Sequence, residues 1–168
     1  MANLYHRVPD NMVGDTLYPL NELKDVHPDV YNKERQKYEG RKAATEQTIS
    51  YLDCRWNDVL HLTAVHPKKI KDALDTDKTF QYYQIDPHRL TPDNTVVYRY
   101  DQTGPLTKED VTTYNPNKVA GYAELPEETK EYYQEMQKQG KRPLLFVHVP
   151  HILYKGSITV SDAEVITV

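Results

Sequence analysis

Seven histidines are the residues of this chain most suited to chemistry, because an imidazole can serve as an acid, a base or a metal ligand near neutral pH. Two pairs lie close in sequence, His61 with His66 and His148 with His151. We expect both pairs in extended chain, where these odd spacings turn the two rings to opposite faces and do not suit one metal ion. We therefore expect no metal, and a buried, hydrogen-bonded structural role for His148. A metal-dependent hydrolase that gathers these four histidines in space is a third alternative for the function.

The sequence carries no motif for an activated nucleophile or a phosphate cradle. Cys54 is the single cysteine, and an isolated cysteine usually fills a core. GxSxG, GxxxxGK[ST] and GxGxxG are all absent. One cysteine also excludes an internal disulfide framework and a zinc site with several cysteines. The sequence therefore disfavours α/β-hydrolases and the usual nucleotide-binding folds.

Charge and hydropathy limit the partners that we expect. The chain has 21 Lys and Arg against 25 Asp and Glu, interspersed, with a formal net charge of −4. This balance offers no footprint for a phosphate backbone, so we expect no unaided nucleic-acid binding. The first residues, MANLYHRVPD, lack an apolar signal region, and no apolar run approaches the roughly 18 residues of a membrane span. Together with the single cysteine, these features predict a soluble, cytoplasmic protein without membrane contact.

Tyrosine dominates the aromatic residues, with fourteen tyrosines against two phenylalanines and one tryptophan. A tyrosine joins an apolar ring to a polar tip, which suits half-exposed faces, clefts and interfaces better than a dry core. We expect most tyrosines to edge a small core. The alternative for the function is a non-catalytic module that binds a protein partner through a tyrosine-rich surface and the loop 101–123.

The most apolar stretch predicts a central strand from Pro143 to Val149. Leu144 to Val147 follow one another without polar relief, which is typical of a strand buried on both faces. Pro143 and Pro150 bracket the stretch at the usual length of a strand, which disfavours a helix.

The remaining elements place this strand in an α+β fold. Prolines at the starts predict helices over 28–40, 66–74 and 126–139; glycines close the first and the last, and the apolar spacing of Ile70, Ala73 and Leu74 supports the second. Strands are expected over 4–8, 80–85, 95–100, 157–160 and 164–168, and an interrupted extended stretch over 49–63. Residues 17–23 are expected to be irregular and 101–123 to form a long loop. The sequence thus predicts a single α+β domain over residues 1–168, with about three helices and a mixed, largely antiparallel sheet.

The order of elements resembles that of ADP-ribosyltransferase-like domains of the DNA-modifying toxin type. The first half carries LYHRV, a helix closed by GR, and VLHLT leading into AVHP; the second half carries FQYYQID, TVVYRY, LLFVHVP and ITVSDAEVITV. The resemblance implies an ADP-ribosyltransferase-like fold with NAD as the substrate. It also implies transfer of ADP-ribose to a macromolecular acceptor.

The same resemblance implies a set of NAD-binding residues. His6 matches the first-strand histidine that contacts the ribose next to nicotinamide. Thr63, or its same-face neighbour His61, would line the nicotinamide pocket. Arg41 would approach the diphosphate, for which a guanidinium is well shaped, and Tyr5 would stack on a ring.

The catalytic acid of the family has no direct match. The family places a glutamate near the final motif strand, where it stabilises an oxocarbenium-like transition state. That strand, RPLLFVHVP, has no acidic residue, so the resemblance assigns the catalytic role to Glu164 on the last strand, together with His6. Val8 stands where the first-strand motif has threonine. The resemblance therefore requires that His6 and Glu164 meet around one nucleotide-sized hollow.

Overall fold

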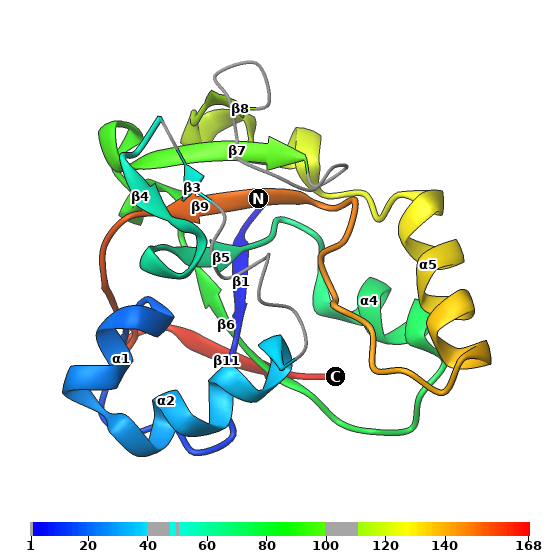
Figure 1. Ribbon diagram of the computed structural model, residues 1–168. Helices are drawn as coiled ribbons and strands as arrows, with labels where there is room; N and C mark the ends of the chain where they lie inside the picture. Colours follow the sequence, from blue (N-terminus) through cyan, green and yellow to red (C-terminus); the bar gives the residue numbers. More distant parts are fainter. Residues whose placement is uncertain (1, 40–47, 50, 100–110) are drawn as a thin grey trace.

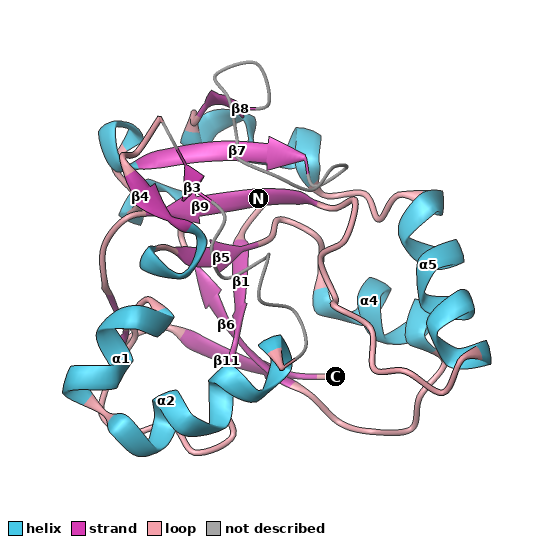
Figure 2. Cartoon of the chain, in the orientation of Figure 1, coloured by secondary structure: helices cyan, strands magenta, loops and turns pink. Residues whose placement is uncertain are grey.

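The structure is a computed structural model that describes residues 2–39, 48–49, 51–99 and 111–168 (Figure 1). Its strands pair antiparallel wherever a pairing is described, and its helices lie on two sides of the strands (Figure 2). The predicted mixed α+β class with a largely antiparallel sheet is therefore confirmed. The described residues contain more α-helices than the three expected: α1 (Leu20–Val26), α2 (Pro28–Glu34), α4 (Pro67–Leu74) and α5 (Glu127–Lys138). None of these helices is both long and apolar enough to cross a bilayer.

Two β-sheets form the scaffold. The first has the order β1-β6-β11, with β1 (Leu4–Arg7), β6 (Gln81–Ile85) and β11 (Glu164–Thr167). The second has the order β5-β9-β7-β8, with β5 (Leu60–Leu62), β9 (Pro150–Tyr154), β7 (Thr95–Arg99) and β8 (Val111–Thr113). Two short pairs complete the described strands: β2 (Thr16–Leu17) with β10 (Ile158–Thr159), and β3 (Thr48–Ile49) with β4 (Cys54–Arg55).

The two sheets meet where β1 passes β5. Tyr5 and Thr63 form an isolated antiparallel bridge, in which each backbone N–H donates to the other residue's carbonyl at 2.8 and 3.1 Å. On the side of the bridge toward Arg7 and Leu60, β1 and β5 separate instead of pairing (Figure 1). We call the region between the two diverging strands the wedge.

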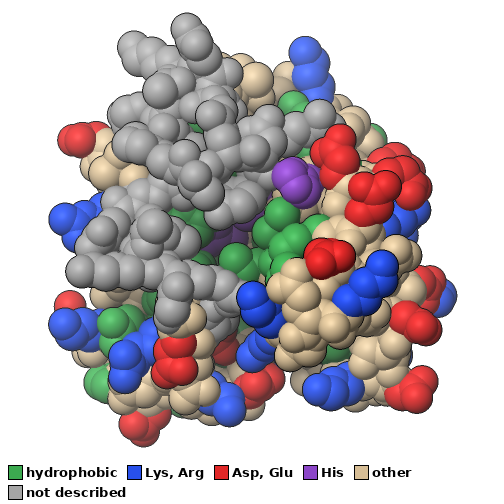
Figure 3. Space-filling view, turned by 45° about the vertical axis from the view of Figure 1, so that its right-hand side comes forward, with side chains coloured by type: hydrophobic (Ala, Val, Ile, Leu, Met, Phe, Trp, Pro, Cys, Tyr) green, Lys and Arg blue, Asp and Glu red, His purple; other side chains and the backbone are tan. Residues whose placement is uncertain are grey.

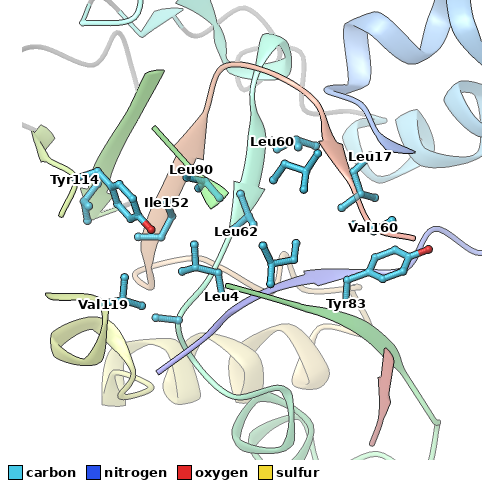
Figure 4. Close-up of a cluster of buried hydrophobic side chains, with 14 residues drawn as sticks. Leu4, Leu17, Leu60, Leu62, Tyr83, Leu90, Tyr114, Val119, Ile152 and Val160 are labelled. Atoms are coloured by element: carbon cyan, nitrogen blue, oxygen red, sulfur yellow. The ribbon is translucent and has the colours of Figure 1, made fainter. Parts of the chain in front are cut away.

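Alternating side chains of the second sheet enter two different apolar clusters, because neighbouring residues of a strand point to opposite faces. Leu62 and Ile152, a cross-strand pair, join Leu4 in the largest cluster (Figure 4). On the other face, Leu153 packs with Trp56 in a second cluster. A third cluster lies between α4 and α5. Apolar clusters thus pack against both faces of the second sheet and hold it in place.

Helix boundaries follow their capping residues. Pro28 and Pro67 start α2 and α4 as predicted, and α2 continues as a 3-10 helix over Arg35–Tyr38, while the predicted end at Gly40 lies outside the described residues. α1 lies in a stretch that was expected to be irregular. Pro19 sits at its N-cap, where a missing N–H costs nothing, and Leu23 is its buried contact.

The predicted central strand over Pro143 to Val149 is wrong. Residues 145–148 form a turn, and the strand begins only at Pro150. His148 has a φ of 63°, in the left-handed region, which interrupts extended chain. Leu145, Phe146 and Val149 pack instead against the cluster at α4 and α5.

The predicted loop over 101–123 is also partly wrong. Within its described part, residues 111–113 form β8 and Pro116–Tyr122 form a 3-10 helix. Residues 101–110 lie outside the described residues. The extended stretch over 49–63 is interrupted by a 3-10 helix at Trp56–Asp58, close to the predicted break.

Candidate functional site

A cavity of about 730 Å³ lies in the wedge where β1 and β5 separate. His6 and Arg7 line it from β1, and Leu60 and His61 line it from β5. Its volume falls within the range of roughly 300 to 1,000 Å³ that is typical of small-molecule and cofactor sites. The end of strand pairing therefore creates a space of ligand size.

Three parts of the chain enclose this cavity. The sheets supply one side, α1 and α2 supply apolar residues such as Leu23 and Val30, and residues 140–147 supply a third side, which we call the wall segment. In Figure 3, hydrophobic side chains gather near the centre of the face beside α5, with Lys and Arg side chains next to them.

The cavity carries more positive than negative charge. Five basic side chains line it against two acidic ones, counted over the described residues. The basic residues are Arg7, Lys33, Lys78, Lys141 and Arg142, and the acidic residues are Asp10 and Glu34. The whole chain has a net charge of −4, so the excess of basic side chains in the cavity lining has the opposite sign to the net charge of the chain. An anionic ligand would be attracted to it.

Four rings at the buried end of the cavity form a ring cluster: Trp56, His61, Phe146 and His151. The centroid of Trp56 lies 4.5 Å from that of His61 and 5.3 Å from that of His151. The centroids of His151 and Phe146 are 5.7 Å apart, with the ring planes perpendicular. Contacts of this kind stabilise aromatic pairs beyond the burial of their area.

The two histidines of the ring cluster are held in the same way. His61 Nε2 lies 2.8 Å from the carbonyl oxygen of Trp56, and His151 Nε2 lies 2.7 Å from that of Phe146. Because a carbonyl oxygen can only accept, each Nε2 carries a proton. Burial lowers the pKa of His151 to about 4, so this imidazole is neutral at pH 7.

Side chains also hold the backbone of the wall segment. Four bonds do so: Leu144 N–H to Tyr132 Oη (3.1 Å), Tyr133 O–H to the Leu145 carbonyl, His151 Nε2–H to the Phe146 carbonyl, and Thr129 O–H to the Val147 carbonyl (2.8 Å). Consecutive residues are thus fixed by α5 and β9 without any strand pairing. These side chains satisfy the polar backbone groups that a strand would have paired.

The structure brings together only part of the predicted NAD site. His6 and His61 line the same cavity. Tyr5 and Thr63 do not line it: Tyr5 is 6% exposed, and the fully buried Thr63 accepts the Val65 N–H on its hydroxyl. Arg41 lies outside the described residues.

Glu164 and His6 lie on opposite faces of the first sheet, so their predicted meeting is wrong. Tyr5, Gln84 and Glu164 form one cross-strand row, and the Gln84 amide donates to Glu164 at 3.3 Å. His6 belongs to the next row, which points the other way. Glu164 is exposed and does not line the cavity.

The remaining nucleophile and metal candidates have structural surroundings. His66 caps α4 by accepting the Lys68 N–H, and Cys54 has a pKa that burial raises to about 11. His148 is half-buried, and its Nδ1 has no hydrogen-bond partner in the described chain. The buried, hydrogen-bonded role expected for His148 belongs to His151. Among the described residues, no group of three His, Cys, Asp or Glu side chains could hold a metal.

The tyrosines are more buried than predicted. Tyr82, Tyr98 and Tyr133 are almost fully buried, and of the tyrosines with described side chains only Tyr51 is exposed, at 45%. Buried hydroxyls have partners, as in the bond from Tyr114 to the Pro87 carbonyl at 2.7 Å. The remaining described tyrosines are buried or half-buried, and the protein-binding alternative stays a prediction.

The sequence patterns did not predict Trp56, Phe146 and His151 as cavity residues. A signal for them does exist, since Trp56 and Phe146 each stand five positions before a histidine, His61 and His151. In both cases the histidine bonds back to the carbonyl of that aromatic residue. Because β5 and β9 are paired, the two units meet in one ring cluster.

Comparisons of the chain with models of protein families, with curated proteins and with solved structures found no match.

Proposed function

We propose that this chain binds NAD or a related nucleotide in the cavity between the two sheets. The observation that carries the proposal is the composition of the cavity lining. Basic side chains outnumber acidic ones there, although the chain as a whole is acidic, and aromatic rings lie at the buried end. A nucleotide contains both anionic phosphates and a planar base. The basic side chains would contact the phosphates, and the aromatic rings would contact the base.

The basic side chains suit phosphate groups by position as well as by number. Lys78 and Lys141 are exposed cavity residues, so their ammonium groups can reach a ligand without losing their hydration completely. Arg7 lies 5.1 Å above the ring of Phe80, and this contact orients its guanidinium beside the cavity. Arginine forms paired hydrogen bonds to phosphate oxygens, and lysine acts as a point charge.

The two predicted histidines support the same ligand. His6 and His61 reach the cavity from separating strands, so both can approach a ligand in the wedge. Short rings on strands give rigid contacts to a ribose or a base. The proposal concerns binding and assigns no transfer step to Glu164, which lies outside the cavity.

Isothermal titration calorimetry with NAD, ADP-ribose and ADP tests the proposal. We expect at least one of these nucleotides to bind. Replacing Lys78 or Lys141 by glutamine should weaken binding by roughly two- to fivefold, because an exposed charge contact contributes up to about 1 kcal/mol. The matched control is Lys118→Gln, an exposed lysine outside the cavity, which should bind as the wild type does. No binding at millimolar nucleotide, or equal affinities in all three variants, would overturn the proposal.

A further inference from the structure

The rings of the ring cluster are not equally accessible from the cavity. His61 and Phe146 are half-buried, whereas Trp56 and His151 are only 4% and 5% exposed. All four line the cavity. A ligand would therefore contact His61 and Phe146 first, with Trp56 and His151 behind them.

His151 is the residue that connects the ring cluster. Besides Trp56 and Phe146, its ring contacts His61 at 5.9 Å and Tyr98 at 6.2 Å between centroids. Its Nε2–H also fixes the backbone of Phe146. These contacts join β5, β7, β9 and the wall segment around one buried imidazole, so moving His151 would move both rings that face the ligand.

The basic side chains of the cavity come mostly from parts of the fold that do not carry the ring cluster. Lys141 follows α5, which is tied to α4 by the bond from the Gln137 amide to the Leu74 carbonyl, and Lys78 precedes the ring that Arg7 covers. The ring cluster instead lies on the 3-10 helix Trp56–Asp58, on β5, on β9 and on the turn before β9. The cavity thus has an aromatic part and a cationic part, and of these elements only the wall segment contributes to both.

We infer that the planar heteroaromatic group of the ligand binds against His61 and Phe146, and that His151 is the positioning residue for this subsite. The inference rests on the proposed function and names the part of the cavity that recognises the base. A planar base can pack against the faces and edges of His61 and Phe146. The four side chains of the ring cluster also bring no negative charge that would repel a nucleotide. The phosphates of the same ligand lie toward Lys78 and Lys141.

Trp56 is the single tryptophan of the chain, so its fluorescence reports on this subsite directly. We expect NAD and AMP to change the emission of Trp56 as they bind, and inorganic diphosphate to bind without changing it. Calorimetry under the same conditions separates the two proposals. A nucleotide that binds without any change in Trp56 emission would overturn the ring subsite and leave the proposed function standing, whereas no binding at all would overturn both.

Two substitutions at His151 test its positioning role. His151→Leu removes the hydrogen bond to the Phe146 carbonyl, and His151→Gln keeps a donor that can reach it. We expect affinity for AMP to fall roughly tenfold in His151→Leu and to recover in part in His151→Gln. Affinity for inorganic diphosphate should stay within twofold of the wild type in both variants. An equal loss for AMP and diphosphate, or no loss for AMP, would overturn the assignment.

Phe146→Leu keeps the test valid if His151 variants fail to fold. Phe146 is half-buried, so leucine can replace it with a smaller loss of packing. We expect AMP to bind roughly three- to tenfold more weakly and diphosphate to bind normally. Tyr51→Leu, which removes an exposed ring outside the cavity, is the matched control and should bind both as the wild type does. Unchanged AMP affinity in Phe146→Leu would overturn the ring subsite.

Discussion

At the scale of single residues, burial keeps His151 neutral within the ring cluster. His151 is 5% exposed, and burial lowers its pKa to about 4 because a charged imidazole would lose its hydration. The bond to the Phe146 carbonyl acts in the opposite direction, since it favours the protonated form, but burial is the larger cause. A neutral His151 can pack against four rings without a buried charge.

This lowered pKa predicts acid sensitivity. Below about pH 6.5 the unfolded chain binds a proton at His151 that the folded chain does not bind, so the free energy of unfolding falls as the pH drops toward 4. The loss should be on the order of 3 kcal/mol and should level off below the folded pKa. Urea denaturation of wild type and His151→Gln between pH 7 and 4 measures it. The same pH dependence in both proteins would contradict this account.

The hydroxyl of Tyr133 gives a second prediction at this scale. Tyr133 is fully buried and donates to the Leu145 carbonyl in the wall segment. Tyr133→Phe leaves that carbonyl without this donor and should lower the free energy of unfolding by about 1 to 3 kcal/mol. Tyr51→Phe changes an exposed tyrosine and should have almost no effect. If urea denaturation gives both variants the same free energy of unfolding, the bond from Tyr133 to the Leu145 carbonyl does not stabilise the fold.

Residue types alone predicted only part of the site. His6 and His61 were predicted through the resemblance to ADP-ribosyltransferase-like domains, and both line the cavity. Glu164 was misplaced because the face on which a strand residue lies depends on its register with β6, which the sequence does not reveal. Trp56, Phe146 and His151 were missed because their proximity depends on the pairing of β5 with β9.

At the scale of elements, the end of α5 sets the start of the wall segment. Gly140 donates to the Gln137 carbonyl at 3.0 Å, and Lys141 donates to the Met136 carbonyl at 2.9 Å, which together form a Schellman motif. Gly140 has a φ of 67°, which residues with a Cβ atom rarely adopt. The chain therefore turns into the wall segment at a position that requires glycine.

Gly140→Ala should therefore destabilise the protein. No atom lies within 4 Å of the Cβ that alanine would add, so the expected loss of about 1 to 2 kcal/mol comes from backbone strain alone. Gly121→Ala is the matched control, because that position also has open space but no left-handed φ, and it should be neutral or slightly stabilising. Thermal denaturation of both variants measures the difference. A Gly140→Ala protein as stable as Gly121→Ala would contradict the assignment.

Two helices whose ends are marked by proline or glycine were predicted correctly, and one apolar segment was assigned to the wrong type of structure. α4 and α5 match their predicted ranges closely, because a proline marks each start and Gly140 follows the end of α5. The apolar stretch over 143–149 was taken for a strand because its hydrophobicity does not distinguish pairing with a neighbour from packing onto helices. Its backbone bonds go to Thr129, Tyr132, Tyr133 and His151, partners far away in sequence or on another element.

At the scale of the whole molecule, the cavity results from the way in which the sheets meet. One bridge, Tyr5 to Thr63, joins them before β1 and β5 separate, and the wall segment and α1 with α2 enclose the wedge. The order of the predicted helices and strands indicated the α+β class, but the position of the cavity depends on where strand pairing stops. That feature is set by long-range contacts and leaves no periodicity in the sequence.

A crystal structure of the protein soaked with NAD or ADP tests the central claim most directly. We predict nucleotide density in the wedge between β1 and β5, with a base against His61 and Phe146 and phosphates toward Lys78 and Lys141. Density elsewhere on the surface, or a wedge filled by the protein's own side chains, would contradict it.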